Sequence, residues 1–171
     1  MPKNVRCNVE DHRLLDGKTK CEDVTKITLP TIEHPTTSVK SAGMVMDVDL
    51  PNIYHYNAME LGISHNNGTN CKTLSNPGIH NIEARVAREN YVTSKGVMDL
   101  ELIKVRVKCA HKSTEKGTVE TGNPYGSNEK YSIIRYEEEW NGEVWTLIDS
   151  TAGKIVINGV DYSSKLASML D

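Results

Sequence analysis

The sequence predicts a mainly β protein, built as two packed sheets or a barrel. Many short segments alternate apolar with polar residues, turn signals containing Gly, Asn or Pro separate them, and hardly any segment has a helical period. Because successive strand side chains point to opposite faces, such segments bury one side and expose the other. A chain of 171 residues suits a single domain over residues 1–171, which buries about 70% of the surface exposed by its unfolded chain.

The first part of the chain is predicted to form two strands and an extended segment. A first strand is expected over Asn4–Glu10 and a second over Asp23–Leu29, with a hairpin turn at Asp16-Gly17 between them. Two prolines then hold residues 31–37 extended, since the residue before a proline is disfavoured in a helix.

The two strongest alternating runs are Val39–Leu50 and Tyr56–His65, divided by Pro51 and Asn52. We expect each run to form a strand that seals a core with one face and borders water with the other. In the first run, Ala42, Met44, Met46, Val48 and Leu50 lie opposite Ser41, Gly43, Val45, Asp47 and Asp49. In the second run, Met59, Leu61 and Ile63 lie opposite Ala58, Glu60, Gly62 and Ser64.

The middle of the chain is predicted to hold a short helix and two strands. The helix is expected at Cys71–Leu74, ended by the Asn-Pro-Gly step that follows it. Ile79–Tyr91 fits a helix face or a strand, and we interpret it as a strand. Val97–His111 is a long strand in which the apolar residues change face at Leu102-Ile103, as a bulge or a passage between sheets would explain.

The last part of the chain begins with a polar loop over Ser113–Lys130, which is longer than most connections. Asn141-Gly142 then supplies the strongest hairpin signal in the sequence. The elements expected around and after it are strands over Tyr131–Trp140, Glu143–Asp149 and Lys154–Asn158, and a helix over Ser163–Leu170.

Composition excludes several classes of function. The 20 Lys and Arg are balanced by 23 Asp and Glu, so the chain has no excess of positive charge with which to hold nucleic acid or an anionic bilayer. No apolar stretch approaches the roughly 20 residues that a membrane helix needs. The segment Met1–Asn4 lacks the apolar residues of a signal peptide. We therefore expect a soluble protein that inserts into no membrane.

The sequence gives no sign of catalysis, a cofactor or a metal. Phosphate-binding glycine loops and the nucleophile-elbow motif are absent, and the six histidines never pair at helical spacing around a carboxylate. The four cysteines are widely spaced without a C-x-x-C pair, so we expect reduced, structural thiols. We predict no catalytic, cofactor-binding or metal-binding residues, and a protein that is not an enzyme.

Two charge patterns lie on the predicted strands. Glu137, Glu138 and Glu139 are consecutive, so neighbouring carboxylates diverge to opposite faces rather than forming a catalytic pair. Lys104, Arg106 and Lys108 repeat at every second position and make one cationic stripe. That stripe indicates an exposed sheet face, pairing with an acidic neighbouring strand, or a contact between subunits.

The order of several short sequence motifs resembles that in the major tail tube proteins of contractile-tailed bacteriophages and phage-tail-like bacteriocins. That family has a T-L-P segment, a G-A-G-M-like step, a V-D-L segment before an alternating strand, and a late I-D and V-N-G-V-D ending. The corresponding motifs in this sequence are Ile27–Pro30, Ser41–Met44, Val48–Leu50, Met59–Gly62, Ile148-Asp149 and Ile157–Asp161. They span residues 24–162. The short helix after the second alternating run is shorter and more polar here than in the family.

The resemblance implies a β-sandwich or barrel with long hairpins that join those of identical neighbours. Hexameric rings with a continuous inner β-barrel would stack into a hollow tube. The implied partners are further copies of the subunit, the sheath, and the baseplate and tape-measure proteins. DNA would enter only as non-specific cargo in the lumen, and the place of the protein would be the virion tail, assembled in the cytoplasm of the host bacterium.

Combining the resemblance with the alternation assigns the two faces of the wall. We expect Asp47, Asp49, Glu60, Gly62 and Ser64 to face the channel, and Met44, Met46, Met59, Leu61 and Ile63 to pack beneath it. Acidic groups in the lumen would repel phosphates and prevent DNA from sticking. The 113–130 loop is a candidate for contact with the next ring or the sheath. The alternatives are a tube protein of a type VI secretion machine, which carries effectors instead of DNA, and a small β-barrel ligand-binding module.

Overall fold

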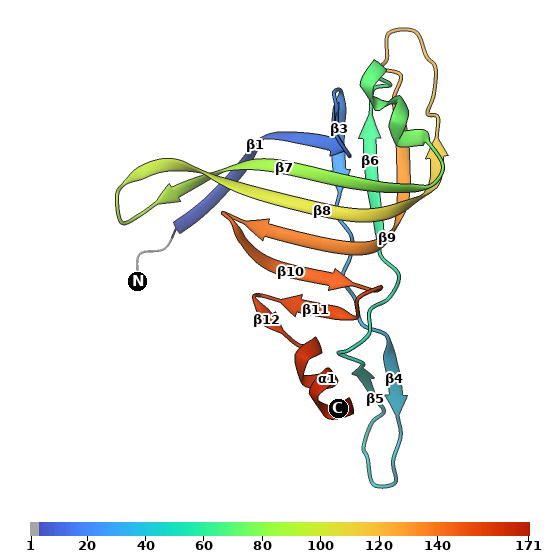
Figure 1. Ribbon diagram of the computed structural model, residues 1–171, viewed down its shortest axis with the longest axis vertical. Coiled ribbons are helices and arrows are strands. Elements are labelled where there is room, and N and C mark those ends of the chain that lie inside the picture. The colour runs from blue at the N-terminus through green and yellow to red at the C-terminus, as the bar shows by residue number, and fades with distance from the viewer. Residues whose placement is uncertain (1–3) are drawn as a thin grey trace.

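The computed structural model describes residues 4–171 and consists almost entirely of antiparallel strands (Figure 1). The fold is therefore mainly β, as predicted. Its elements are β1 (Asn4–Asp16), β2 (Thr19–Cys21), β3 (Val24–Thr28), β4 (Thr36–Val39), β5 (Val48–Pro51), β6 (Glu60–His65), the 3-10 helix η1 (Thr69–Ser75), β7 (Ile79–Val92), β8 (Val97–Glu115), β9 (Ser127–Trp140), β10 (Glu143–Asp149), β11 (Lys154–Ile157), β12 (Val160–Asp161) and α1 (Ser163–Leu170).

Ten of these strands form one sheet, and β4 pairs with β5 in a separate hairpin. The main order is β12-β11-β10-β9-β8-β7-β1-β2, while β6 pairs with both β9 and β3. β9 thus has β8 along one edge, and along the other edge it has β6 at its first half and β10 at its second. This branching folds the sheet over itself, so that one of its faces encloses the core.

The core lies between the two halves of the folded sheet and is covered at one end by η1. Its buried side chains come from almost every long strand: Leu14, Cys21, Met59, Leu61, Ile63, Cys71, Leu74, Ile82, Ala84, Val105, Val107, Cys109, Tyr131, Tyr136 and Ile148. In the absence of Phe, two tyrosines fill the centre, and Tyr131 donates its buried hydroxyl to the carbonyl of Leu74 in η1 at 2.6 Å.

Most predicted elements are confirmed. The strands over Ile79–Tyr91 and Val97–His111 are present as β7 and β8, and the Asn141-Gly142 hairpin joins β9 to β10 with both turn residues at positive φ. The C-terminal helix spans the predicted residues. The turn after Asp16 leads into β2, which pairs back onto β1, and β3 then crosses to β6.

One predicted strand is wrong. Residues 39–50 do not form a single strand: β4 and β5 face each other as a hairpin, and residues 40–47 form the irregular loop between them. Gly43 adopts a φ of 90°, and the amide of Met44 donates to the carbonyl of Ser41 at 3.1 Å, so the chain reverses here. Alternation alone cannot distinguish one long strand from two arms joined by a turn. The second run is a strand only from Glu60 onward.

The predicted Ser113–Lys130 loop is too long. β8 continues to Glu115 and β9 begins at Ser127, which leaves residues 116–126 as the loop. The polar residues at its two ends pair across the strands because their side chains satisfy one another in a buried network described below. Among residues 4–171, no helix is long and apolar enough to cross a membrane.

Candidate functional site

The face of the main sheet opposite the core is lined with charged side chains. Strand register places Glu60 opposite Ser132, Ser132 opposite Ala110, and Arg106 opposite Glu137, so β6, β8 and β9 present one continuous surface. Ile134 is an extra residue in β9 at this point, which shifts the outward positions from Ser132 to Arg135. We call this surface the charged face; its members include Glu60, Glu83, Arg85, Lys104, Arg106, Lys108, Lys112, Lys130, Arg135, Glu137, Glu139 and Asp149.

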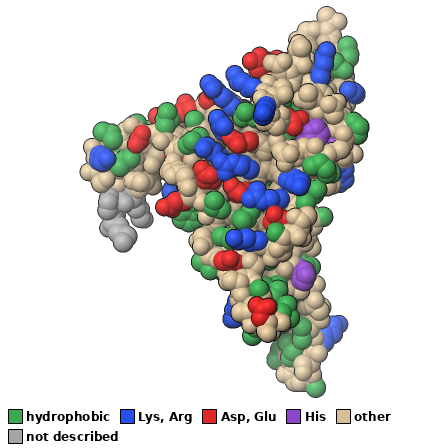
Figure 2. Space-filling model, in the orientation of Figure 1, with side chains coloured by type: hydrophobic (Ala, Val, Ile, Leu, Met, Phe, Trp, Pro, Cys, Tyr) green, Lys and Arg blue, Asp and Glu red, His purple; other side chains and the backbone are tan. Residues whose placement is uncertain are grey.

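Ion pairs join neighbouring strands across the charged face. The guanidinium of Arg106 contacts Glu137 at 2.7 Å, Glu139 at 2.8 Å and Glu83 at 3.4 Å. Hydrogen bonding from Arg106 lowers the pKa of Glu139, and the carboxylates raise that of Arg106. The predicted cationic stripe is therefore paired with acidic strands on both sides. Figure 2 shows basic and acidic side chains interspersed over β7 to β10.

The structure divides the predicted channel residues between two places. Glu60, Gly62 and Ser64 alternate with buried positions along β6 and lie on the charged face, where Glu60 accepts from Lys112 at 2.7 Å. Asp47 and Asp49 belong instead to the β4–β5 hairpin, and Asp47 pairs with Lys40 at 3.1 Å. The two groups share no sheet, and their orientation toward a channel stays a prediction.

The residues predicted to lie beneath the wall are divided in the same way. Met59, Leu61 and Ile63 are buried under β6, whereas Met44 is 42% and Met46 73% exposed in the single chain. The methionines lie in the loop of the short hairpin, where this chain supplies no second layer. Their burial in an assembly remains a prediction.

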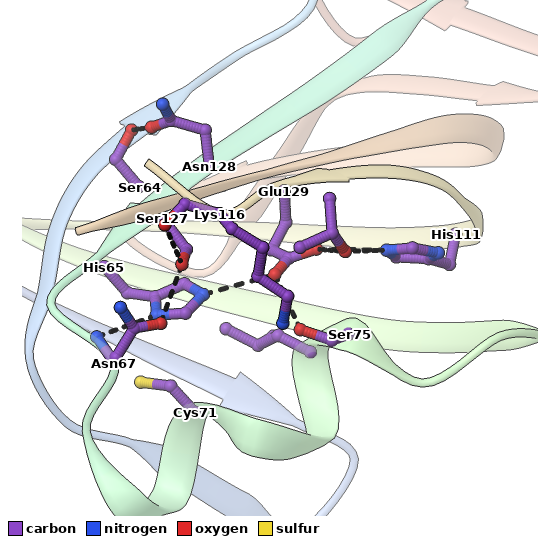
Figure 3. Close-up of polar contacts among 12 residues, drawn as sticks. Ser64, His65, Asn67, Cys71, Ser75, His111, Lys116, Ser127, Asn128 and Glu129 are labelled. Atoms are coloured by element: carbon purple, nitrogen blue, oxygen red, sulfur yellow. Dashed lines mark hydrogen bonds and ion pairs between the residues drawn. The ribbon is translucent and has the colours of Figure 1, made fainter. Parts of the chain in front are cut away.

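A buried carboxylate lies on the core side of the main sheet, where β6, β8, β9 and η1 meet (Figure 3). Glu129 is fully buried and accepts hydrogen bonds from Ser75 at 2.7 Å, from His111 at 3.0 Å, from Thr114 at 2.5 Å and from His65 at 3.4 Å. Burial acts to raise the pKa of Glu129, but these donors together outweigh it, and the net pKa is lowered. The network therefore favours an ionised Glu129.

Sequence patterns alone did not predict this network. The sequence does contain one sign of it: Glu129 is in phase with Tyr131, and therefore occupies a core position of an alternating strand. Only the fold shows that donors from three other elements meet it. In the described residues, no group of three His, Cys, Asp or Glu side chains is placed to hold a metal ion.

A long ribbon projects from the body where β9 ends. Trp140, the last residue of β9, is opposite Ile103, so residues 97–102 of β8 pair only with β7, and β1 pairs with the other edge of β7 (Figure 1). This is where the apolar residues change face. The register has no bulge between β7 and β8; instead, apolar side chains occupy the outer face of the ribbon and are exposed: Val5, Tyr91, Met98, Leu100 and Leu102.

A charged cluster fixes the base of this long ribbon. Glu101 is 5% exposed and accepts from Arg88 at 2.6 Å and from Arg6 at 3.4 Å. Both guanidinium groups also lie over the ring of Trp140, at 4.8 Å for Arg88 and 5.5 Å for Arg6. The cluster ties β1, β7, β8 and β9 together, so the ribbon leaves the body in a fixed direction.

Replacing Glu129 with Gln is expected to destabilise the subunit by about 2 kcal/mol, because an amide NH₂ would face donors that now meet a carboxylate. Urea unfolding of the subunit measures this loss. Glu115→Gln, an exposed change in the adjacent strand, is the matched control. Equal unfolding midpoints for the two variants would contradict the role given to the network.

The same carboxylate makes stability depend on pH. Because the pKa of Glu129 is lower in the folded protein than in the unfolded chain, its stabilisation is present above about pH 4.3 and is lost as the pH falls through the folded value. The urea midpoint of the native subunit should therefore decrease between about pH 5 and pH 3 more steeply than that of Glu129→Gln. Parallel curves would show that other groups control the acid transition.

On the charged face, Arg106→Met is expected to cost about 1 kcal/mol, since it leaves three carboxylates close together in a partly screened environment. Lys108→Met removes a cation from the same strand and face, opposite Arg135, and is expected to leave stability unchanged or to raise it slightly. Thermal unfolding of both variants compares the two sites. Greater loss in Lys108→Met than in Arg106→Met would refute the pairing.

Comparison with known proteins agrees with this geometry. The family profile described as phage tail tube protein FII matches residues 12–170. No curated protein matches the sequence.

Two solved structures share the fold. One is a cryo-EM structure of the PVC sheath/tube terminator of an extracellular contractile injection system in the extended state, with a TM-score of 0.54, 11% identity, and coverage of 78% of this chain and 96% of that one. The other is the PVC sheath-tube complex in the extended state, with a TM-score of 0.52, 11% identity, and coverage of 77% and 90%. At this identity they show the fold alone. The profile match extends over nearly the whole sequence: the chain belongs to the phage tail tube protein FII family and is a structural subunit of a tail tube.

Proposed function

We propose that residues 1–171 act as one domain that closes with identical copies into hexameric rings, and that the rings stack into a hollow tube. The observation that carries this proposal is the long ribbon. Its β8 segment pairs with a strand on only one edge, and five apolar side chains on one face have no cover in the single chain. An unpaired strand edge beside an apolar face favours pairing with another chain, and the closure of a ring removes such edges.

The charged face is the surface that we assign to the lumen. It is exposed to solvent, and the core lies directly behind it. Glu60, Gly62 and Ser64 lie on it together with the outward residues of β8 and β9. The short hairpin would bring Asp47 and Asp49 to the channel and would cover Met44 and Met46 with a neighbouring copy. The lumen would then be of mixed charge rather than acidic.

A lumen of mixed charge would still allow cargo to pass without strong binding. Arg106 and Lys104 each face a carboxylate, so few basic groups on this part of the wall are left to bind phosphate strongly. DNA would pass only as non-specific cargo, or the tube would act without DNA as a bacteriocin that punctures a membrane. The subunit itself would insert into no membrane.

The remaining outward elements are proposed to meet the other tail components. The 116–126 loop and α1, whose Leu166, Met169 and Leu170 are exposed, would contact the next ring or the sheath. Baseplate and tape-measure proteins would contact the ends and the lumen. We place the assembled subunit in the virion tail or a phage-tail-like particle, built in the host bacterial cytoplasm, and assign it no catalysis.

Two alternatives have weaker support. A type VI secretion tube protein would share the ring and the lumen but carry effectors, whereas the family match is to phage tails. A ligand-binding module would need open aromatic side chains. The indole rings of Trp140 and Trp145 do converge, at 6.2 Å between centroids, but Trp140 is occupied by Arg6 and Arg88.

Electron microscopy of the purified protein tests the assembly. The native chain is expected to form rings or hollow filaments, whereas Leu100→Asp should remain a folded single subunit because it places a charge on the apolar face of the ribbon. Val119→Asp places the same charge at an exposed residue of the 116–126 loop, which is proposed to contact the next ring or the sheath rather than to close the ring, so this variant should still form single rings.

A native chain that stays monodisperse at high concentration, or a Leu100→Asp variant that assembles as the native chain does, would refute the role of the ribbon. Cryo-electron microscopy of the tubes then tests the lumen. Density for Lys104, Arg106 and Lys108 on the outer wall would overturn the assignment of the charged face without affecting the ring itself.

A further inference from the structure

Two buried cysteines from distant parts of the chain lie close together in the core. Cys21 is the last residue of β2 and Cys71 lies in η1, and these two elements are in contact. The Cys71 thiol donates to the carbonyl of Glu22, the residue that follows Cys21, so the two cysteines lie close together. Both side chains are almost fully buried and both thiols are free.

Their surroundings keep the thiols protonated in the resting subunit. Burial, followed by the charges of Cys71 and Asp16, raises the pKa of Cys21 to about 11. Burial also raises the pKa of Cys71, with Asp23 adding to the effect. Because the thiolate is the reactive form, the pair reacts slowly and only with reagents that reach it.

Cys21 is one of the residues that line a cavity at the edge of the sheet. The cavity has a volume of about 260 Å³ and is lined among others by Asp11, His12, Arg13 and Asp23. Cys71 is fully buried and does not line this cavity. Cys109, the other fully buried thiol, is also outside it and so serves as an internal comparison.

We propose that Cys21 and Cys71 are a modification site at which a small peroxide forms an intramolecular disulfide. The Cys21 thiolate attacks one oxygen of hydrogen peroxide, the O–O bond breaks, and the departing hydroxide takes a proton to leave as water. The Cys21 sulfenic acid then accepts attack by the Cys71 sulfur, the S–O bond breaks, and a second water leaves. Two thiols and one peroxide give one disulfide and two waters.

The disulfide would join β2 at the edge of the main sheet to η1, whose Ser75 donates to Glu129. It would close a long loop that contains β3, the short hairpin and β6, and a long loop favours stabilisation by a cross-link. In oxidising surroundings, the disulfide would therefore stabilise the end of the core that only the 3-10 helix η1 covers.

Peptide mapping tests the proposal on the full native chain and on Cys7→Ser, which lacks the exposed thiol. After hydrogen peroxide treatment, alkylation in denaturant and digestion without reductant, the peptides containing Cys21 and Cys71 should be joined by a disulfide, with a mass two hydrogens below the sum of the two separate peptides. The melting temperature should rise by about 5 °C and return to its starting value with a thiol reductant.

Variants separate this cross-link from other oxidation. Cys109→Ser should keep both the link and the temperature shift, whereas Cys21→Ser should lose both. If Cys21→Ser does not fold, the map of disulfide-linked peptides from the native chain still tests the proposal. Recovery of Cys71 as the free, alkylated thiol, with Cys21 unchanged or oxidised to sulfinic acid, overturns the proposal. So does a link that contains Cys109.

Discussion

The pairing of β9 with three strands is the constraint on which the rest of the structure depends. β8 occupies one edge of β9, while β6 and β10 share the other, so the sheet branches and must fold over its own core. The extra residue at Ile134 lies at the branch and exchanges the inward and outward positions of β9. Without that exchange, Tyr131 and Tyr136 could not both face the core, and the charges of Lys130 and Glu137 could not share the outer face.

The two ends of β9 are held by buried carboxylates that work in the same way. Glu129 at the first half meets donors from η1 and β8, and Glu101, close to the far end, meets Arg88 and Arg6. In each case burial of the carboxylate is compensated by several hydrogen bonds, which leaves its pKa lowered. These polar clusters fix directions that apolar packing leaves free, namely the angle of the ribbon and the position of η1.

The likeness of this chain to injection-system tube structures at 11% identity illustrates which properties the fold requires. The fold requires a sheet with one solvent-exposed face and a core behind the other. Many sequences satisfy that pattern, because it specifies alternation and edges rather than individual side chains. The short motifs of the sequence lie at turns and at the starts and ends of strands, where local conformation restricts the choice of residue.

Local chemistry determined much of this protein from sequence alone. Alternation identified β6 to β9, the Asn141-Gly142 pair fixed the hairpin to β10, and spacing placed Lys104, Arg106 and Lys108 on one face, because each signal acts between residues close in sequence. Tertiary structure decided what depends on distant residues: that residues 39–50 form a hairpin instead of one strand, and that Glu129 is buried among four donors. It also decided that β9 stops at the place where the sequence of β8 changes its apolar face. Those outcomes follow from which strands become neighbours, and alternation does not encode the partner of a strand.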